Sequence, residues 1–166
     1  MSKAAEKPSF MKQKALFLDR DGTVNVEKNY VFRIEDVEFR EGIFELVKTF
    51  ADDGFLIFIV TNQSGIARGF YTEEDFYKLT HWMVEQFRQK GITITRVYFC
   101  PHHPDFTGSC NCRKPNPGML LQAIEEYNLD PAACLLIGDH ETDVRAGKNA
   151  NIGRNFLIPA TGKVKI

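Results

Sequence analysis

Four short apolar runs, each ending in polar residues, limit what this chain can fold into more than any other feature. They cover residues 15–18, 56–60, 97–99 and 134–137, and residues 155–158 form a fifth candidate. Continuous apolar runs of this length are typical of strands that are buried on both faces, as in a parallel sheet. The sequence therefore predicts a sheet whose strands lie at the centre of the fold.

Helical patterns lie between the apolar runs. Apolar residues recur at helical spacing within residues 42–53 and 73–90, and shorter helices are predicted over residues 119–127 and 141–149. This alternation predicts an α/β fold of the Rossmann-like type, with an open, mainly parallel sheet and helices on both faces. Ligands of such folds bind beyond the carboxyl ends of the strands, which is where the polar motifs of this chain lie.

The length of 166 residues suits a single domain, expected over residues 14–166 after a flexible tail at residues 1–13. The net charge of -1 means that the chain lacks the excess of basic residues that binding to nucleic acid or to a membrane surface generally needs. No apolar run approaches the ~20 residues of a membrane span, and the first residues lack a secretory signal. We therefore expect a cytoplasmic protein, in which the four cysteines are reduced.

Two aspartates, Asp19 and Asp21, directly follow the first apolar run. With a divalent cation, one carboxylate can attack phosphorus to form a mixed anhydride that water then cleaves. The second can protonate the leaving oxygen and later activate the water. The alternatives are a turn with two solvated aspartates, or part of a calcium loop, for which Glu27 lies at the wrong spacing.

Three further motifs follow later strands. The segment Thr61–Gly65 offers a hydroxyl and backbone N–H groups that can hold phosphate oxygens, although a simple polar turn has the same composition. Arg113 and Lys114 are either a solvated basic pair or fixed cations that stabilise a transferring phosphoryl group. Asp139 would provide an acidic ligand for Mg²⁺, or would only cap the helix that follows it.

Cysteine and histidine residues cluster between residues 100 and 112. Four ligands in two close pairs suit a tetrahedral structural zinc site, whereas independent reduced thiols are the alternative interpretation. His103 would then be a spare ligand or a surface residue, and Cys134 an inert core thiol. Because the loop ends at Arg113, a metal ion there would fix the neighbouring cations. The predicted zinc ligands are Cys100, His102, Cys110 and Cys112.

The four motifs, in this order at strand ends, resemble those of the haloacid dehalogenase superfamily of phosphatases. The resemblance covers residues 14 to 158. It implies that Asp19 is the nucleophile and Asp21 the general acid/base, and that Thr61 and Lys114 stabilise the transferring phosphoryl group. It also implies that Asp19, the backbone carbonyl of Asp21 and Asp139 bind Mg²⁺.

The segments FLDRDGTVNV, VTNQSGIARG, CPHHP…CNCRKPNPGML and IGDHETD look similar to the D,D-heptose 1,7-bisphosphate phosphatases. These enzymes have small inserts in place of a large cap domain. The histidinol-phosphate phosphatases have a similar zinc loop, but the segments NVEKNYV and PNPGM favour the heptose enzymes. The resemblance implies substrate contacts at Glu27, Lys28, Asn29, Tyr30, Thr61, Asn62, Gln63, Ser64, Arg113 and Lys114.

The expected function is Mg²⁺-dependent hydrolysis of a sugar phosphate, namely the C7 phosphate of D-glycero-D-manno-heptose 1,7-bisphosphate on the route to ADP-heptose for lipopolysaccharide. A histidinol-phosphate phosphatase and a phosphotransferase are alternatives within the same chemistry. A catalytically inactive, zinc-stabilised binding module is a third, although the presence of both Asp19 and Asp21 argues against it. Without a large cap, the protein is expected to be a monomer whose only partner is its substrate.

Overall fold

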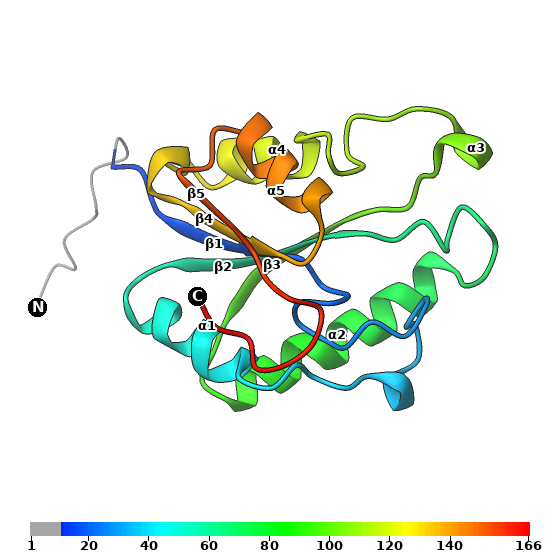
Figure 1. Cartoon of the computed structure of the whole chain (residues 1–166), viewed down its shortest axis with the longest axis horizontal. Coiled ribbons are helices and arrows are strands. Elements are labelled where there is room, and N and C mark those ends of the chain that lie inside the picture. The colour runs from blue at the N-terminus through cyan, green and yellow to red at the C-terminus, as the bar shows by residue number, and fades with distance from the viewer. Residues whose placement is uncertain (1–10) are drawn as a thin grey trace, which may run out of the picture.

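A five-stranded parallel sheet forms the centre of the computed structural model, which describes residues 11–166 (Figure 1). The strands lie in the order β3-β2-β1-β4-β5. Their bounds are β1 (Ala15–Leu18), β2 (Leu56–Asn62), β3 (Ile94–Cys100), β4 (Leu135–Gly138) and β5 (Arg154–Leu157). The predicted α/β fold class is therefore confirmed.

Helices cover both faces of this sheet. Figure 1 shows α1 (Ile43–Asp52) and α2 (Glu73–Gln89) on one side, and α4 (Gly118–Glu126) and α5 (Glu141–Asn149) on the other. Within β1, Leu16 and Leu18 pack in the core beneath α1 and α2, whereas Phe17 packs in the core beneath α4. Successive side chains of a strand point to opposite faces, so a strand between two helical layers needs apolar residues at every position.

The edge strand β3 begins three residues earlier than the apolar run at residues 97–99 predicts. Within its first residues, Ile94 is buried, Thr95 is half-buried and Arg96 is exposed. An edge strand has a more accessible surface than a central one, so polar residues interrupt its apolar pattern.

The loops between the carboxyl ends of β1, β2 and β3 and the long helices α1, α2 and α4 hold at most short helical segments. The 3₁₀ helix at Ile34–Asp36 lies in the first connection, and α3 (Pro104–Thr107) lies in the predicted zinc loop; a second 3₁₀ helix, Pro131–Ala133, precedes β4. As predicted, no connection among residues 11–166 forms a large cap domain. No described helix is long and apolar enough to span a membrane.

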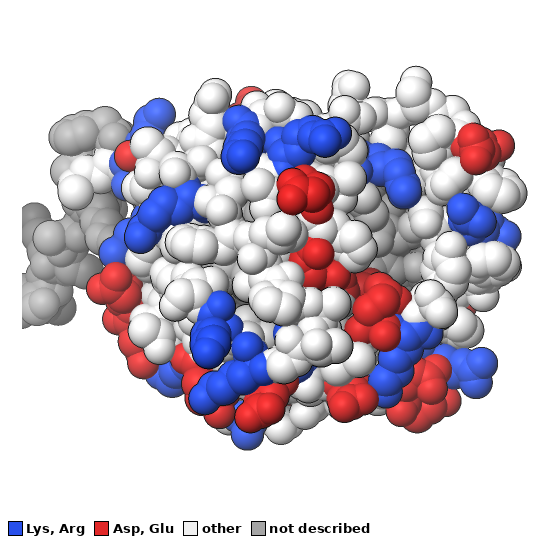
Figure 2. Space-filling model, in the orientation of Figure 1, with Lys and Arg blue, Asp and Glu red and all other residues white. Residues whose placement is uncertain are grey.

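Residues 1–10 of the predicted N-terminal tail lie outside the described residues. Gln13, at the end of that tail, bonds to the body of the molecule. Its N–H donates to the carbonyl of Asn128 at 3.0 Å, and its carbonyl accepts from the N–H of Asp130 at 2.8 Å. On the face shown in Figure 2, basic and acidic side chains are interspersed rather than gathered by sign.

Candidate active site

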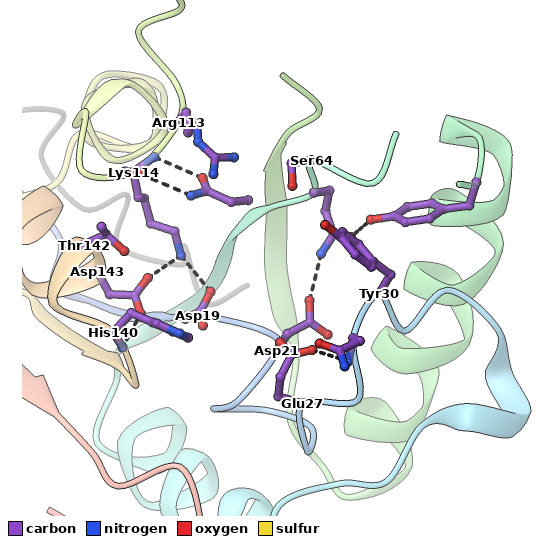
Figure 3. A pocket seen from close by; sticks show the side chains of 14 residues that line it. Asp19, Asp21, Glu27, Tyr30, Ser64, Arg113, Lys114, His140, Thr142 and Asp143 are labelled. Atoms are coloured by element: carbon purple, nitrogen blue, oxygen red, sulfur yellow. Dashed lines mark hydrogen bonds and ion pairs between the residues drawn. The ribbon is translucent and has the colours of Figure 1, made fainter. Parts of the chain in front are cut away.

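A pocket of about 430 Å³ lies at the carboxyl ends of the central strands (Figure 3). Residues from the segments that follow β1, β2, β3 and β4 all contribute to it, as the placement of the motifs predicts. Its lining consists of Asp19, Asp21, Glu27, Asn29, Tyr30, Asn62, Gln63, Ser64, Tyr71, Arg113, Lys114, His140, Thr142 and Asp143.

Lys114 lies at the floor of the pocket between two carboxylates. Its Nζ atom is 2.7 Å from Oδ1 of Asp19 and 2.6 Å from Oδ1 of Asp143, and it also donates to the carbonyl of Val60. All three charged side chains are at most 10% exposed. The ammonium is therefore fixed in direction, as a group that stabilises developing negative charge must be.

Asn62 fixes the backbone of Lys114. Its amide accepts from the N–H of Lys114 at 3.0 Å and donates to the carbonyl of Lys114 at 3.2 Å. This pair of hydrogen bonds joins the end of β2 to the segment that follows the zinc loop. Asn62, predicted as a substrate contact, thus also positions the catalytic candidate Lys114.

Asp21 is held by three donors. Arg20 and Asn25 donate to its Oδ1 at 2.9 and 3.1 Å, and Gln63 donates to its Oδ2 at 3.0 Å. The Gln63 amide is itself oriented, because its Oε1 accepts from the hydroxyl of Tyr71 and its Nε2 also donates to Thr61. The carboxylate predicted to act as general acid/base is therefore fixed by charge-assisted hydrogen bonds.

Thr61 is buried and does not line the pocket; its hydroxyl accepts from Gln63 at 2.8 Å. Ser64, the next polar residue along this segment, does line the pocket. Within the described residues, Thr61 therefore supports the network around Asp21 rather than facing the open space.

The site carries more negative than positive charge on its metal-binding side. Asp19, Asp139 and Asp143 have oxygen atoms that lie within 4.8 Å of one another, in a group that also includes His140. Burial raises the pKa of Asp19, and Asp143 and Asp139 raise it further, while the Lys114 ammonium opposes this effect. Burial would lower the pKa of Lys114, but the carboxylates of Asp19 and Asp143 raise it.

One ammonium among three buried carboxylates leaves two negative charges to be compensated. A divalent cation with a preference for oxygen ligands would compensate them and would keep Asp19 ionised, as a nucleophile must be. The donor set therefore fits Mg²⁺, with Asp19 and Asp139 as its carboxylate ligands.

Gly22 forms the wall of the site beside Asp139. Its φ angle is +90°, and a Cβ atom at this position would collide with the carboxylate of Asp139. Glycine is needed here for both reasons, since it adopts positive φ freely and carries no side chain. Asp139 is also contacted by His140, whose Nδ1 lies 3.1 Å from its Oδ2.

The predicted substrate loop lies along one side of the pocket. Glu27, Asn29 and Tyr30 line the pocket, whereas Lys28 points away and pairs with Glu38 at 3.1 Å. Asn29 and Tyr30 both have positive φ angles, of 55° and 63°. Consecutive non-glycine residues in this region cost free energy, and such strain often occurs at functional sites.

The four predicted zinc ligands come together beside the pocket. The Sγ atom of Cys100 lies 3.6 Å from both Cys110 Sγ and His102 Nδ1, and Cys112 Sγ lies 3.7 Å from Cys110 Sγ and 3.3 Å from His102 Nδ1. Ligands on a tetrahedral zinc ion with bonds of about 2.3 Å lie about 3.8 Å apart, so the spacing of these four side chains fits a zinc ion.

The ionisation of Cys110 also favours a metal ion, because zinc binds the thiolate form. Burial opposes ionisation of Cys110, but hydrogen bonds from the backbone of Arg113 and the neighbouring thiols lower its pKa to about 7. The set fits a zinc ion.

The zinc loop contacts its surroundings through Arg113, which lines the pocket, and through His103. Arg113 donates to the carbonyl of His102 at 3.3 Å, which ties a pocket residue to a zinc ligand. His103 is not part of the cluster: its Nδ1 accepts from the N–H of Asp105, and its Nε2 lies 3.2 Å from Arg68. It therefore caps α3 and joins this loop to the segment after β2.

Four lining residues were not among the predicted site residues: Tyr71, His140, Thr142 and Asp143. Asp143 belongs to the motif Gly138-Asp139-x-x-x-Asp143, and it lies in the first turn of α5, close to the strand end that carries Asp139. The sequence carried no comparable signal for Tyr71, whose hydroxyl reaches Gln63 only through the fold of the intervening loop.

Comparisons with known proteins agree with this arrangement. A family model described as HAD-hydrolase-like matches residues 111–163. The D-glycero-alpha-D-manno-heptose-1,7-bisphosphate 7-phosphatase of Campylobacter jejuni is 51% identical over 148 residues, which cover 89% of this chain and 84% of that protein. The D-glycero-beta-D-manno-heptose-1,7-bisphosphate 7-phosphatase of Yersinia pestis is 49% identical over 154 residues, covering 90% and 81%.

A solved structure is also similar. The D,D-heptose 1,7-bisphosphate phosphatase of B. bronchiseptica, in complex with magnesium and phosphate, is 29% identical and has a TM-score of 0.76. The similarity covers 83% of this chain and 76% of that one.

Proposed function

Because this chain belongs to the family of heptose-1,7-bisphosphate 7-phosphatases, within the HAD-like hydrolases, we propose that it hydrolyses the C7 phosphate of D-glycero-D-manno-heptose 1,7-bisphosphate. The observation that carries this proposal is the buried Asp19–Lys114–Asp143 group at the floor of the pocket, beside the fixed carboxylate of Asp21. The product would serve the synthesis of ADP-heptose, a precursor of lipopolysaccharide.

The reaction has two steps. In the first, a carboxylate oxygen of Asp19 forms a bond to phosphorus as the bond from phosphorus to the sugar oxygen breaks, and Asp21 gives its proton to that oxygen. In the second, Asp21 takes a proton from water as the water oxygen attacks the phosphoryl group and releases Asp19. Lys114 stabilises the negative charge on the phosphoryl oxygens in both steps.

Mg²⁺, held by Asp19, Asp139 and the backbone carbonyl of Asp21, would neutralise phosphate charge when bound. Zinc on the four Cys and His ligands would be structural, since four protein ligands leave no open position. Its role would be to hold the segment from Cys110 to Lys114, and thereby Arg113. A guanidinium at this point of the pocket rim suits the second phosphate or the sugar hydroxyls.

The test is phosphate release by the purified protein with Mg²⁺, comparing heptose bisphosphate with histidinol phosphate at equal concentration. Both anomers of the bisphosphate belong in the experiment, because relatives named for each are similar to this chain. A strong preference for the bisphosphate is expected. Asp19→Asn keeps the shape of the side chain and should abolish release, and an unchanged rate in this variant would exclude the proposed nucleophile.

A further inference from the structure

Arg40 is a buried cation outside the pocket, and it bonds to backbone carbonyls. Only 4% of the residue is exposed. One guanidinium nitrogen donates to the carbonyl of Gly22, and the other donates to the carbonyls of Pro159 and Gly162, both at 3.0 Å. Within residues 11–166 it forms no ion pair with a carboxylate. Burying an unpaired charge is unfavourable, so the position calls for an explanation.

The contact with Gly22 places Arg40 directly behind the metal-binding side of the site. The N–H of Gly22 donates to the carbonyl of Asn25 at 2.7 Å, and Arg40 binds its carbonyl, so both peptides that flank its Cα atom are fixed. Gly22 follows Asp21 in the chain and packs against Asp139. A rotation at Gly22 would therefore move the Asp21 carbonyl relative to the Asp139 carboxylate.

The other contacts tie this loop to the C-terminal segment. Residues 159–164 fold over Arg40, and the N–H of Val164 donates to the carbonyl of Glu41 at 2.8 Å. The side chain of Val164 is buried in the core beneath α1. Arg40 thus lies between a segment anchored in the core and the loop that carries Asp21.

From these contacts we infer that Arg40 is a positioning residue for the Mg²⁺ site. It holds the Asp21–Gly22 loop against Asp139, using the C-terminal segment as its support. This inference rests on the proposed function for the identity of the cation. It assigns to a residue outside the pocket a role in metal affinity, which groups that support metal ligands typically affect about 10- to 100-fold.

The test compares Arg40→Met and Arg40→Lys with the wild type. Calorimetric titration of the substrate-free protein gives the Kd for Mg²⁺, and kinetics give kcat and KM. In Arg40→Met we expect Mg²⁺ to bind about tenfold more weakly, as for other groups that support metal ligands. We expect kcat to fall in parallel at limiting Mg²⁺, with KM for the sugar phosphate changed by less than about threefold, since binding of the sugar is unaffected.

Arg40→Lys keeps the charge but cannot span all three carbonyls, so its Mg²⁺ affinity should lie between those of the wild type and Arg40→Met. Arg96→Met is the control, because Arg96 is 46% exposed and pairs with Glu126, and neither residue lines the pocket. A folded Arg40→Met with wild-type Mg²⁺ affinity would overturn the inference. If that variant does not fold, wild-type affinity in Arg40→Lys would overturn it. Failure of the wild type to release phosphate would count against the proposed function instead.

Discussion

The Nζ atom of Lys114 lies 2.6 Å from Oδ1 of Asp143, and both side chains are 3% exposed. Asp143 therefore orients the cation that is proposed to stabilise the phosphoryl group. It also accepts from the N–H of His140 at 3.0 Å, which fixes the first turn of α5 beneath the pocket. The same carboxyl group thus connects the stability of α5 to the geometry of Lys114.

Asp143→Asn tests this connection. With Mg²⁺ bound, the charges of the site balance, so removing the Asp143 charge leaves one buried positive charge uncompensated; in the presence of Mg²⁺ we expect a loss of about 3 kcal/mol in the free energy of unfolding. We expect kcat to fall about 10- to 100-fold, because small displacements of a catalytic group are costly. Urea unfolding and steady-state kinetics measure the two effects. Asp53→Asn is the control, since the Asp53 side chain is 74% exposed, and its stability and kcat should match the wild type. Equal stability of Asp143→Asn and the wild type would contradict this prediction.

Loss of the zinc ion proposed at the Cys/His cluster should weaken both folding and turnover. Cys110→Ser removes one of four ligands, and binding energy at such a site is partly folding energy. We expect less than one zinc per chain by elemental analysis, a lower melting temperature, and a lower kcat/KM because the His102 carbonyl no longer fixes Arg113. Cys134→Ala is the matched control, because Cys134 is buried outside the cluster. It should retain one zinc, and a full zinc content in Cys110→Ser would refute the ligand assignment.

The sheet could be predicted because its central strands are buried on both faces. Leu16, Phe17 and Leu18 are all fully buried, so a continuous apolar run marks the strand. The start of β3 could not be predicted in the same way, because Thr95 and Arg96 lie on an edge strand. An apolar pattern predicts a strand correctly where every residue of the strand is buried. It fails on an edge strand, where exposed positions carry polar residues.

The sequence predicted the site residues whose positions depend mainly on where a strand ends. Asp19, Asp21 and Lys114 follow strands and meet in the pocket. Asp143 was not among the predicted site residues, because its partner Lys114 is distant in the sequence. Lys28 was expected to contact substrate with its neighbours, but the turn at Asn29 directs its side chain toward Glu38. Side-chain direction in an irregular loop depends on tertiary contacts that a motif does not encode.

Gly22→Ala should disable the site through sterics and backbone strain together. A non-glycine residue at a φ of +90° costs of order 1–3 kcal/mol, and the added Cβ would also displace the Asp139 carboxylate. Gly69→Ala is the matched control, because Gly69 has a φ of +75° but nothing lies within 4 Å of its added Cβ. We expect similar losses of stability from backbone strain, but a large loss of phosphate release only in Gly22→Ala. Equal activity of the two variants would show that Asp139 tolerates displacement.

Tyr71 should influence the reaction through Gln63 without touching the reacting atoms. Its hydroxyl donates to Oε1 of Gln63, which directs the amide nitrogen of Gln63 at Asp21. The ring of Tyr71 stacks on Phe32 at a centroid distance of 5.1 Å, so Tyr71→Phe removes the hydroxyl and keeps the packing.

We expect Tyr71→Phe to lose about 1 kcal/mol of stability, as is usual for one hydrogen bond. Without this hydroxyl the Gln63 amide can rotate, and the hydrogen bond from its Nε2 to Asp21 is then formed for a smaller fraction of the time. Because about 1.4 kcal/mol corresponds to a tenfold change in rate, a partial loss of orientation should lower kcat about three- to tenfold. Tyr77→Phe provides the comparison, since Tyr77 is 47% exposed and packs against the rings of Phe76 and Phe99. If both variants keep the wild-type kcat, the Tyr71 hydroxyl is not needed to orient the Gln63 amide toward Asp21, and the prediction is wrong.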